Sequence, residues 1–143
     1  MRIRLAKSDD LKACVAIDAP NFNIFNRDKR HAHFQEMIPK GSMLVLEKDS
    51  KILAYATFDP DWFGCTFLKL VVTDMNYRRL GLASQLIQHI ESHHCPSGKF
   101  FSSTEADNTS SIKLHEQHGF VETGWLDNLP QPHREIFYYK AIS

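Results

Sequence analysis

The sequence lacks several features that would mark particular classes of protein. It contains no apolar run of about 20 residues, the length that crosses a bilayer, and its start, 1–5, has no apolar stretch of signal-peptide length. It has no excess of charge, because 17 basic side chains face 17 acidic ones. A protein that binds nucleic acid by neutralising phosphates usually shows a basic excess. We therefore expect a cytoplasmic protein that binds neither membranes nor nucleic acid.

Cysteine is also scarce. Cys14, Cys65 and Cys95 lie far apart and form no C-x-x-C pair, so neither a disulfide framework nor a zinc knuckle is predicted. Among the eight histidines, the segment 115–118 (H-E-Q-H) is one residue short of the metal-binding pattern H-E-x-x-H. No other carboxylate or thiol spacing completes a recognised site. We predict no bound metal.

What the sequence does contain is enough apolar material for a core. The chain has 143 residues, of which 43% are hydrophobic and 11% aromatic. Chains of roughly 100–200 residues usually form one domain, and this composition argues against disorder. We therefore predict one folded domain over residues 1–143.

Two kinds of hydrophobic pattern alternate along the chain, and together they indicate a mixed α/β fold. Alternating or β-rich runs predict strands at 2–6, 42–46, 52–58, 65–73, 100–104, 121–126 and 136–142. Helical spacing and capping residues predict helices from Ser8 toward Pro20, at 28–37, from Leu82 to just before Pro96, and at 110–118. The segment 21–26 is predicted as a loop with apolar contacts, and turns are expected at 48–51 and 59–62.

One segment carries a clear chemical signal. The predicted strand ends at 71–73, and a turn containing Arg78, Arg79 and Gly81 leads into a helix that starts near Leu82. A helix N-terminus presents unpaired backbone amides and partial positive charge, which suit a phosphate group. Gly81 would let the backbone approach the anion closely. An ordinary strand-to-helix turn is the alternative.

A second segment, 108–120, places Asn108, Leu114, Gly119 and Phe120 at fixed spacing. In combination the two segments resemble the GNAT superfamily of acyl-CoA-dependent N-acetyltransferases. Residues 78–83 match its pattern [QR]-x-x-G-x-[GA], and the second segment matches N-x(5)-L-[Y]-x-x-x-G-F. The order of predicted strands and helices agrees with that family over the whole chain.

The resemblance implies a GNAT-type fold. This is a mixed, mostly antiparallel central sheet of about seven strands with about four flanking helices, splayed between the fourth and fifth strands. It also implies acetyl-CoA as the acyl donor, with the strand end pairing with the pantetheine arm and the turn amides holding the pyrophosphate. The residues expected at the cofactor are Val71, Val72, Thr73, Arg78, Arg79, Leu80, Gly81, Leu82, Ala83, Ser84, Asn108 and Ser111. Asn108 could also be a simple helix cap.

Acetylation of an amine requires proton transfer. An alkyl amine has a pKa of about 10.4 and is mostly protonated at neutral pH, so a base or a chain of water must accept its proton. The position of His115 holds a tyrosine acid in many relatives, and histidine can act as acid or base; the alternative is a partly exposed histidine without a catalytic task. Ribosomal-protein alanine acetyltransferases carry a glutamate base where this chain has Ser103. We predict Glu105 as the base, with Asp59, Asp61 or ordered water as alternatives.

The acceptor segments of the family combine aromatic rings with carboxylates in this chain, a pairing that suits a cationic amine. The residues in question are Phe22, Phe25, Trp62, Phe63, Trp125, Asp59, Asp61 and Asp127. We therefore predict transfer of the acetyl group to a small cationic primary amine by direct attack in a ternary complex. The alternatives are a peptide or protein amine as acceptor, or a non-catalytic acyl-CoA-binding regulatory module. Pairing of late strands between two copies leaves a homodimer as an option.

Overall fold

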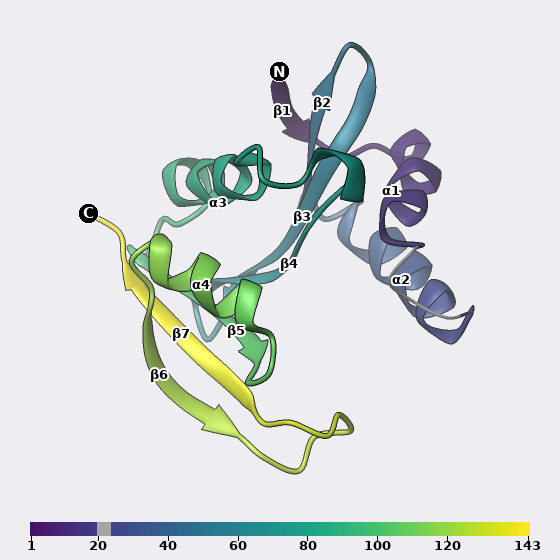
Figure 1. Cartoon of the computed structure of the whole chain (residues 1–143). Coiled ribbons are helices and arrows are strands. Elements are labelled where there is room, and N and C mark those ends of the chain that lie inside the picture. Colours follow the sequence, from purple (N-terminus) through teal and green to yellow (C-terminus); the bar gives the residue numbers. More distant parts are fainter. Residues whose placement is uncertain (20–23) are drawn as a thin grey trace. The chain divides into compact units, whose positions relative to one another are not determined.

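The computed structural model describes residues 1–19 and 24–143 (Figure 1). The strands are β1 (Arg2–Leu5), β2 (Met43–Lys48), β3 (Lys51–Trp62), β4 (Cys65–Thr73), β5 (Lys99–Glu105), β6 (Val121–Leu126) and β7 (Glu135–Ala141). The helices are α1 (Leu11–Asp18), α2 (Ile24–Met37), α3 (Leu82–His93) and α4 (Thr109–Gln117), with short 3-10 turns η1 (Ser8–Asp10) and η3 (Met75–Tyr77). No helix in the described ranges is long and apolar enough to span a membrane.

The strands are hydrogen-bonded in the order β1-β2-β3-β4-β5-β7-β6. The β4–β5 pair is parallel, whereas β1–β2, β2–β3, β5–β7 and β6–β7 are antiparallel. This arrangement confirms the predicted mixed α/β fold with seven strands. The chain divides into two compact units, one made of Met1–Phe58 and Leu70–Ile90 and the other of Asp59–Lys69 and Glu91–Ser143. One domain over 1–143 stays a prediction.

Two local predictions were wrong. Helix α2 begins at Ile24, so 24–26 are helical and not part of a loop; its backbone continues through Asn26 because asparagine only weakly opposes a helix interior. Residues 21–23 lie outside the described part of the chain. Strand β3 runs on to Trp62 through the predicted turn at 59–62. The chain reverses at Phe63 and Gly64, which both have positive φ (53° and 77°), as a two-residue type I′ hairpin turn requires.

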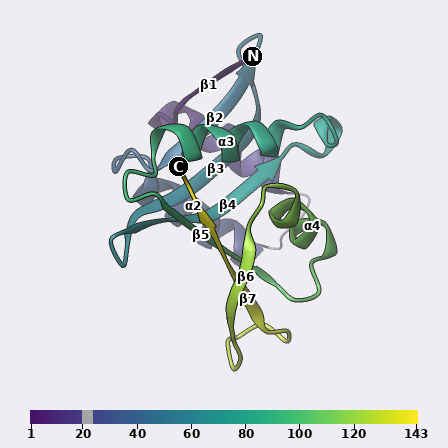
Figure 2. The same cartoon turned by 90° about the vertical axis from the view of Figure 1, so that its left-hand side faces the viewer.

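The first unit has helices on both faces of its strands. The cluster beneath α1 and α2 is apolar and buried: Cys14, Ile17, Phe34, Met37, Met43, Val45, Ile52 and Tyr55. Helix α3 lies on the opposite side of these strands from α1 and α2 (Figures 1 and 2), and it buries Leu82, Leu86, Ile87 and Ile90. Because alternate strand residues point to opposite faces, β2 and β3 are buried on both sides.

The second unit has β5 as its centre. Residues 66–68 of β4 pair with 100–102 of β5 in parallel, and β7 pairs with the full length of β5 in antiparallel register. Helix α4 packs on one face of these strands, where the His115 ring lies 5.3 Å from that of Phe120 and 4.5 Å from that of Tyr138. The alternate residues of β5 and β7 point to the other face. Phe101 and Tyr139, which are paired across the two strands, lie on this face.

Candidate active site

The connection between β4 and α3 carries most of the residues predicted to bind the cofactor. Val71–Thr73 end β4, and the Asp74 side chain then caps η3 by accepting a hydrogen bond at Oδ1 from the Asn76 amide at 2.9 Å. Residues 78–81 are exposed and lead into α3 at Leu82. The predicted strand, turn and helix are therefore continuous within the first unit.

The backbone of this connection is left-handed at two residues. The φ angle is 66° at Arg79 and 76° at Gly81. That conformation costs roughly 1–2 kcal/mol for a residue with a Cβ and little for glycine. A Cβ at Gly81 would meet no atom within 4 Å, so the φ angle and not lack of space favours glycine. Strained turns of this kind cluster at ligand-binding sites.

The start of α3 has the chemistry of an anion site. The Gly81 carbonyl accepts a hydrogen bond from the Gln85 amide at 3.1 Å and so opens the helical pattern. In any α-helix the first-turn amides have no acceptor inside the helix, and the helix dipole adds positive charge there. Arg78 and Arg79 are exposed beside this end and contribute two positive charges. The segment therefore fits a phosphate group.

Asn108 caps α4 in the second unit. Its Oδ1 accepts hydrogen bonds from the Ser111 amide and the Ser110 hydroxyl, both at 3.2 Å. The helix-cap interpretation of Asn108 is thus confirmed. A cap uses only the side-chain oxygen, and in the described residues the Asn108 amide nitrogen donates no hydrogen bond. The nitrogen therefore remains able to donate to a ligand.

His115 is buried, with 5% of its surface exposed, so the partial exposure assumed in the alternative is wrong, while its catalytic task stays a prediction. Its Nδ1 lies 2.7 Å from the Ser111 carbonyl oxygen and its Nε2 lies 2.7 Å from Ser102 Oγ. A carbonyl only accepts, so Nδ1 carries the hydrogen, and in the neutral ring Nε2 accepts from the Ser102 hydroxyl. The ring stacks on that of Tyr138 with an interplanar angle of 20°.

The surroundings of His115 favour its neutral form. Burial lowers the pKa of His115, and this effect outweighs the Ser111 carbonyl, which raises it. The Ser102 hydroxyl at Nε2 can relay a proton to or from the ring, whereas the Ser111 carbonyl at Nδ1 only accepts a hydrogen bond. The structure thus brings His115 and Ser111 together on α4, with Ser102 of β5 as a third member that the sequence analysis did not name.

Glu105 ends β5 and belongs to a small group of ligand-bearing side chains. The side-chain ligand atoms of Glu105, Asp107 and His133 all lie within 4.8 Å of one another. His133 Nε2 is 3.3 Å from Asp107 Oδ2, and both side chains are about half exposed. Such a group could hold a cation, although exposed acidic groups are common in proteins without one. His133 lies 28 residues after Glu105, so no spacing pattern connects the two.

A second carboxylate lies beside Ser103. The Ser103 hydroxyl donates to Glu135 Oε2 at 2.7 Å, and Gln131 Nε2 donates to Glu135 Oε1 at 3.3 Å. Glu135 begins β7 directly opposite Glu105 in the antiparallel register. Opposed residues share one face of a sheet, so Glu105 and Glu135 extend to the same side. The sequence analysis missed Glu135 because only the β5–β7 register places it there.

The same face of the second unit is aromatic. The Trp62 ring centre lies 4.7 Å from that of Phe67, 5.1 Å from that of Phe101 and 6.3 Å from that of Phe137. The rings of Phe101 and Tyr139 are 5.1 Å apart. All five side chains are only partly buried. We call Trp62, Phe67, Phe101, Phe137 and Tyr139 the aromatic face; with Glu105 and Glu135 it combines ring surfaces and negative charge.

The other residues predicted for the acceptor have varied surroundings. Phe22 lies outside the described residues. Phe63 is 88% exposed beside Trp62, and Asp59 Oδ1 accepts a hydrogen bond from the Asp61 amide. Trp125 and Asp127 both contact Arg134, which lies 4.8 Å from the Trp125 ring centre and donates to both oxygens of Asp127. The Arg134 guanidinium therefore already binds both the Trp125 ring and the Asp127 carboxylate.

Comparisons with known proteins place these observations in a family. The sequence profile of the acetyltransferase (GNAT) family matches residues 11–120. A GNAT acetyltransferase from Bacillus cereus is similar at 33% identity and a TM-score of 0.85, covering 98% of this chain and 96% of that chain. An N-acetyltransferase from Staphylococcus aureus is similar at 27% identity and a TM-score of 0.75, covering 99% of this chain and 98% of that chain.

The fold is also shared with yncA from Salmonella typhimurium, whose structure holds its cofactor acetyl-CoA. That likeness has 20% identity and a TM-score of 0.75, and it covers 99% of this chain and 94% of that chain. A comparison with curated protein sequences found no match. The family profile and the Bacillus cereus relative both span most of the chain. The chain therefore belongs to the GNAT acetyltransferase family and is an acyl-CoA-dependent N-acetyltransferase.

Proposed function

We propose that this enzyme transfers the acetyl group of acetyl-CoA to the primary amine of a small cationic acceptor, by direct attack in a ternary complex. We further propose that both compact units act as one catalytic domain over residues 1–143. The single observation that carries the choice of acceptor is the combination of the aromatic face with two carboxylates, Glu105 and Glu135, on one side of the second unit. Ring faces and carboxylates both attract ammonium groups.

The residues of the first unit fit the anionic part of the donor. The amides of 79–84 are proposed to bind the pyrophosphate, assisted by the charge of Arg78, because the start of α3 provides amide donors and positive charge. The backbone of Val71–Thr73 is proposed to hydrogen-bond the pantetheine arm as a neighbouring strand would. The Val72 amide is then a candidate donor to the oxyanion that develops during acyl transfer. When bound, acetyl-CoA supplies the thioester whose acetyl group is transferred.

The second unit would hold the donor from α4. The Asn108 side-chain nitrogen is proposed to donate to a carbonyl oxygen of the cofactor, which is compatible with the cap because that contact uses only Oδ1. Ser111 is proposed to contribute its hydroxyl. These two assignments rest on the family pattern in 108–120 and on the donors that the cap leaves available.

Proton transfer is assigned to three groups. Glu105 is proposed as the base that receives the amine proton, and Glu135 is the additional candidate that the structure supplies, since its carboxylate is hydrogen-bonded to Ser103. His115 is proposed to serve the departing thiolate from its protonated form: the Nε2 proton passes to the Ser102 oxygen while the Ser102 hydroxyl hydrogen passes to the thiolate, which leaves the ring neutral. A base of this kind contributes roughly 10²–10⁴-fold in rate, so each assignment is measurable.

The proposal is tested by release of free thiol from acetyl-CoA. The purified enzyme is incubated with monoamines, polyamines, aminoglycosides, and peptides with a free N-terminus, each at matched concentration. We expect the highest kcat/KM with small cationic amines. Faster turnover of peptides than of every small amine would instead assign the enzyme to peptide or protein amines.

A further inference from the structure

A cavity of about 470 Å³ lies within the first unit, apart from every residue assigned above to the donor or acceptor. It is open to solvent and is bordered by the start of α1, the β2–β3 turn and the residue that follows β4. Its lining includes Asp9, Ala13, Lys51, Ile52 and Asp74. The volume falls in the range of about 300–1,000 Å³ that is usual for small-molecule sites.

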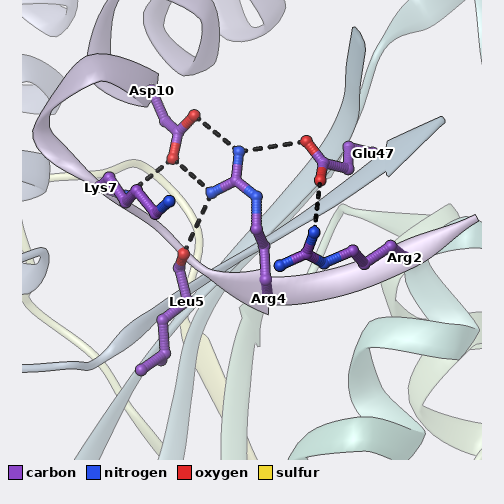
Figure 3. A network of polar contacts seen from close by, with 6 residues as sticks. All are labelled: Arg2, Arg4, Leu5, Lys7, Asp10 and Glu47. Atoms are coloured by element: carbon purple, nitrogen blue, oxygen red, sulfur yellow. Dashed lines mark hydrogen bonds and ion pairs between the residues drawn. The ribbon is translucent and has the colours of Figure 1, made fainter. Parts of the chain in front are cut away.

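Arg4 and Asp10 form one wall of the cavity, and both belong to a network of ion pairs centred on Arg4 (Figure 3). The Arg4 guanidinium donates to both oxygens of Asp10, at 2.7 and 3.0 Å, and to Glu47 Oε2 at 3.1 Å. The Lys7 amide donates to Asp10 Oδ2 at 2.7 Å, and Arg2 lies 3.9 Å from the other oxygen of Glu47. Two arginines and two carboxylates thus neutralise one another, and the wall is held in place before any ligand arrives.

The charges that remain around the cavity are not balanced. Asp9 and Asp74 line it, and neither forms an ion pair in the described part of the chain. Lys51 is the single cation left beside them in the lining; its Nζ donates to the Tyr77 hydroxyl at 3.3 Å and lies 5.0 Å from the Tyr77 ring centre. Two carboxylates against one ammonium leave a negative excess of one charge.

Apart from Ser50, the rest of the lining is apolar. Ala13, Ala16 and Ile17 of α1 face the cavity, as does Ile52 of β3. Ala13 and Ala16, three residues apart on α1, leave the space that larger side chains would fill, and their methyl groups offer contact for an alkyl chain. A ligand that matches this lining has one positive charge and a short aliphatic body.

We propose that this cavity is a binding site for a small aliphatic ammonium compound. Its ammonium group hydrogen-bonds the Asp9 and Asp74 carboxylates, and its alkyl chain packs on Ala13, Ala16 and Ile52. The Arg4–Asp10 pair forms the rigid wall, and its two hydrogen bonds stay intact when the ligand binds. The lining of this site shares no residue with the acceptor site proposed above.

The test uses the enzyme without acetyl-CoA, so that its outcome is independent of acetyl transfer. n-Butylammonium is titrated into ¹⁵N-labelled protein, with n-butanol and butyrate as neutral and anionic counterparts. We expect saturable chemical-shift changes at the amides of Asp9, Lys51 and Asp74 with butylammonium alone. Equal responses to n-butanol, a response to butyrate in its place, or no response at these amides would each overturn the proposal.

Two variants separate this site from any other amine site. D9N removes one proposed ligand and is expected to weaken binding at these amides about tenfold, as the loss of a charged hydrogen bond predicts. D49N is the matched control, since Asp49 is exposed on the β2–β3 turn and outside the lining. A13L fills the cavity without changing charge and should also abolish the response. Equal affinities of D9N and D49N, or unchanged binding by A13L, would contradict the proposal.

Discussion

The Ser103 hydroxyl donates a hydrogen bond of 2.7 Å to the carboxylate of Glu135. The family resemblance implies that Ser103 takes the place of the glutamate base of ribosomal-protein alanine acetyltransferases, and a serine cannot act as such a base. The neighbouring strand β7 supplies a carboxylate within hydrogen-bond distance of it. Glu135 is therefore a candidate base beside Ser103, in addition to Glu105 at the end of β5.

We predict that Glu135→Gln lowers kcat by about 10²-fold while the KM for acetyl-CoA stays within about twofold, because loss of a general base affects proton transfer more than donor binding. Glutamine can still accept the Ser103 hydrogen bond, so the local structure is kept. The measurement is initial-rate thiol release with the best amine of the acceptor panel.

Two further variants complete that experiment. Glu122→Gln removes a carboxylate from an exposed position of β6 and should leave kcat unchanged. Glu105→Gln reports on the other candidate base. If Glu105→Gln alone reduces kcat and Glu135→Gln matches Glu122→Gln, Glu135 has no role in proton transfer.

We predict that Gly81→Ala destabilises the enzyme by about 1 kcal/mol and raises the KM for acetyl-CoA, because alanine opposes the φ of 76° at this turn. Gly124→Ala is the matched control, since Gly124 has no positive φ and a Cβ there meets nothing within 4 Å. Chemical denaturation and initial rates measure the two effects. An unchanged KM in Gly81→Ala would show that the turn does not hold the donor.

We predict that His115 makes the enzyme less stable in mild acid. Burial lowers the pKa of His115 below its ordinary value of 6.5, so the unfolded chain binds the proton more readily than the folded one. The contribution to stability is therefore present above about pH 6.5 and is lost as the pH falls below it. The measurement is the free energy of unfolding in urea between pH 7.5 and 5.

The test variant for that prediction is His115→Phe. It keeps a ring against Tyr138, and the Ser102 hydroxyl, which loses Nε2 as its acceptor, can turn to donate to the Leu68 carbonyl, 3.4 Å away. The variant should lose less stability between pH 7.5 and 5 than the wild type does. His31→Gln, on an exposed part of α2, should follow the wild type. Equal pH dependence in His115→Phe and wild type would contradict the assignment.

The parts of the fold that the sequence predicted are those that local patterns determine. A β-rich run of residues predicted the strand 65–73 at its observed bounds, and the residue type and position of Asn108 indicated a helix cap. The predictions that were wrong concern features of the fold that residues far apart in the sequence determine. The hairpin turn came at Phe63 and Gly64 instead of 59–62, and a Phe with positive φ has no local signal.

The site was predictable to the same degree. The cofactor segment 78–84 is continuous in sequence, so its turn and helix start could be read from the order of residues. Glu135 could not, since its proximity to Ser103 depends on the β5–β7 register. The burial of His115 also could not, because Tyr138 and Ser102, which cover it, belong to strands far from α4 in sequence.

We predict that the Arg4–Asp10 pair makes an acid-sensitive contribution to stability. The hydrogen bond from Arg4 holds the pKa of Asp10 below its ordinary value of 3.8, so the contribution is complete above that value and is lost as the pH falls below it. At pH 7, Asp10→Asn should destabilise the fold by about 2 kcal/mol, since a charged hydrogen bond is lost from a side chain that is only 11% exposed. Asp9→Asn, at the exposed neighbouring residue, should change stability by less than about 0.5 kcal/mol. Urea denaturation at pH 7 and pH 3 measures both, and the difference between Asp10→Asn and wild type should shrink at pH 3. A difference that stays constant with pH would show that the ionised pair does not stabilise the fold.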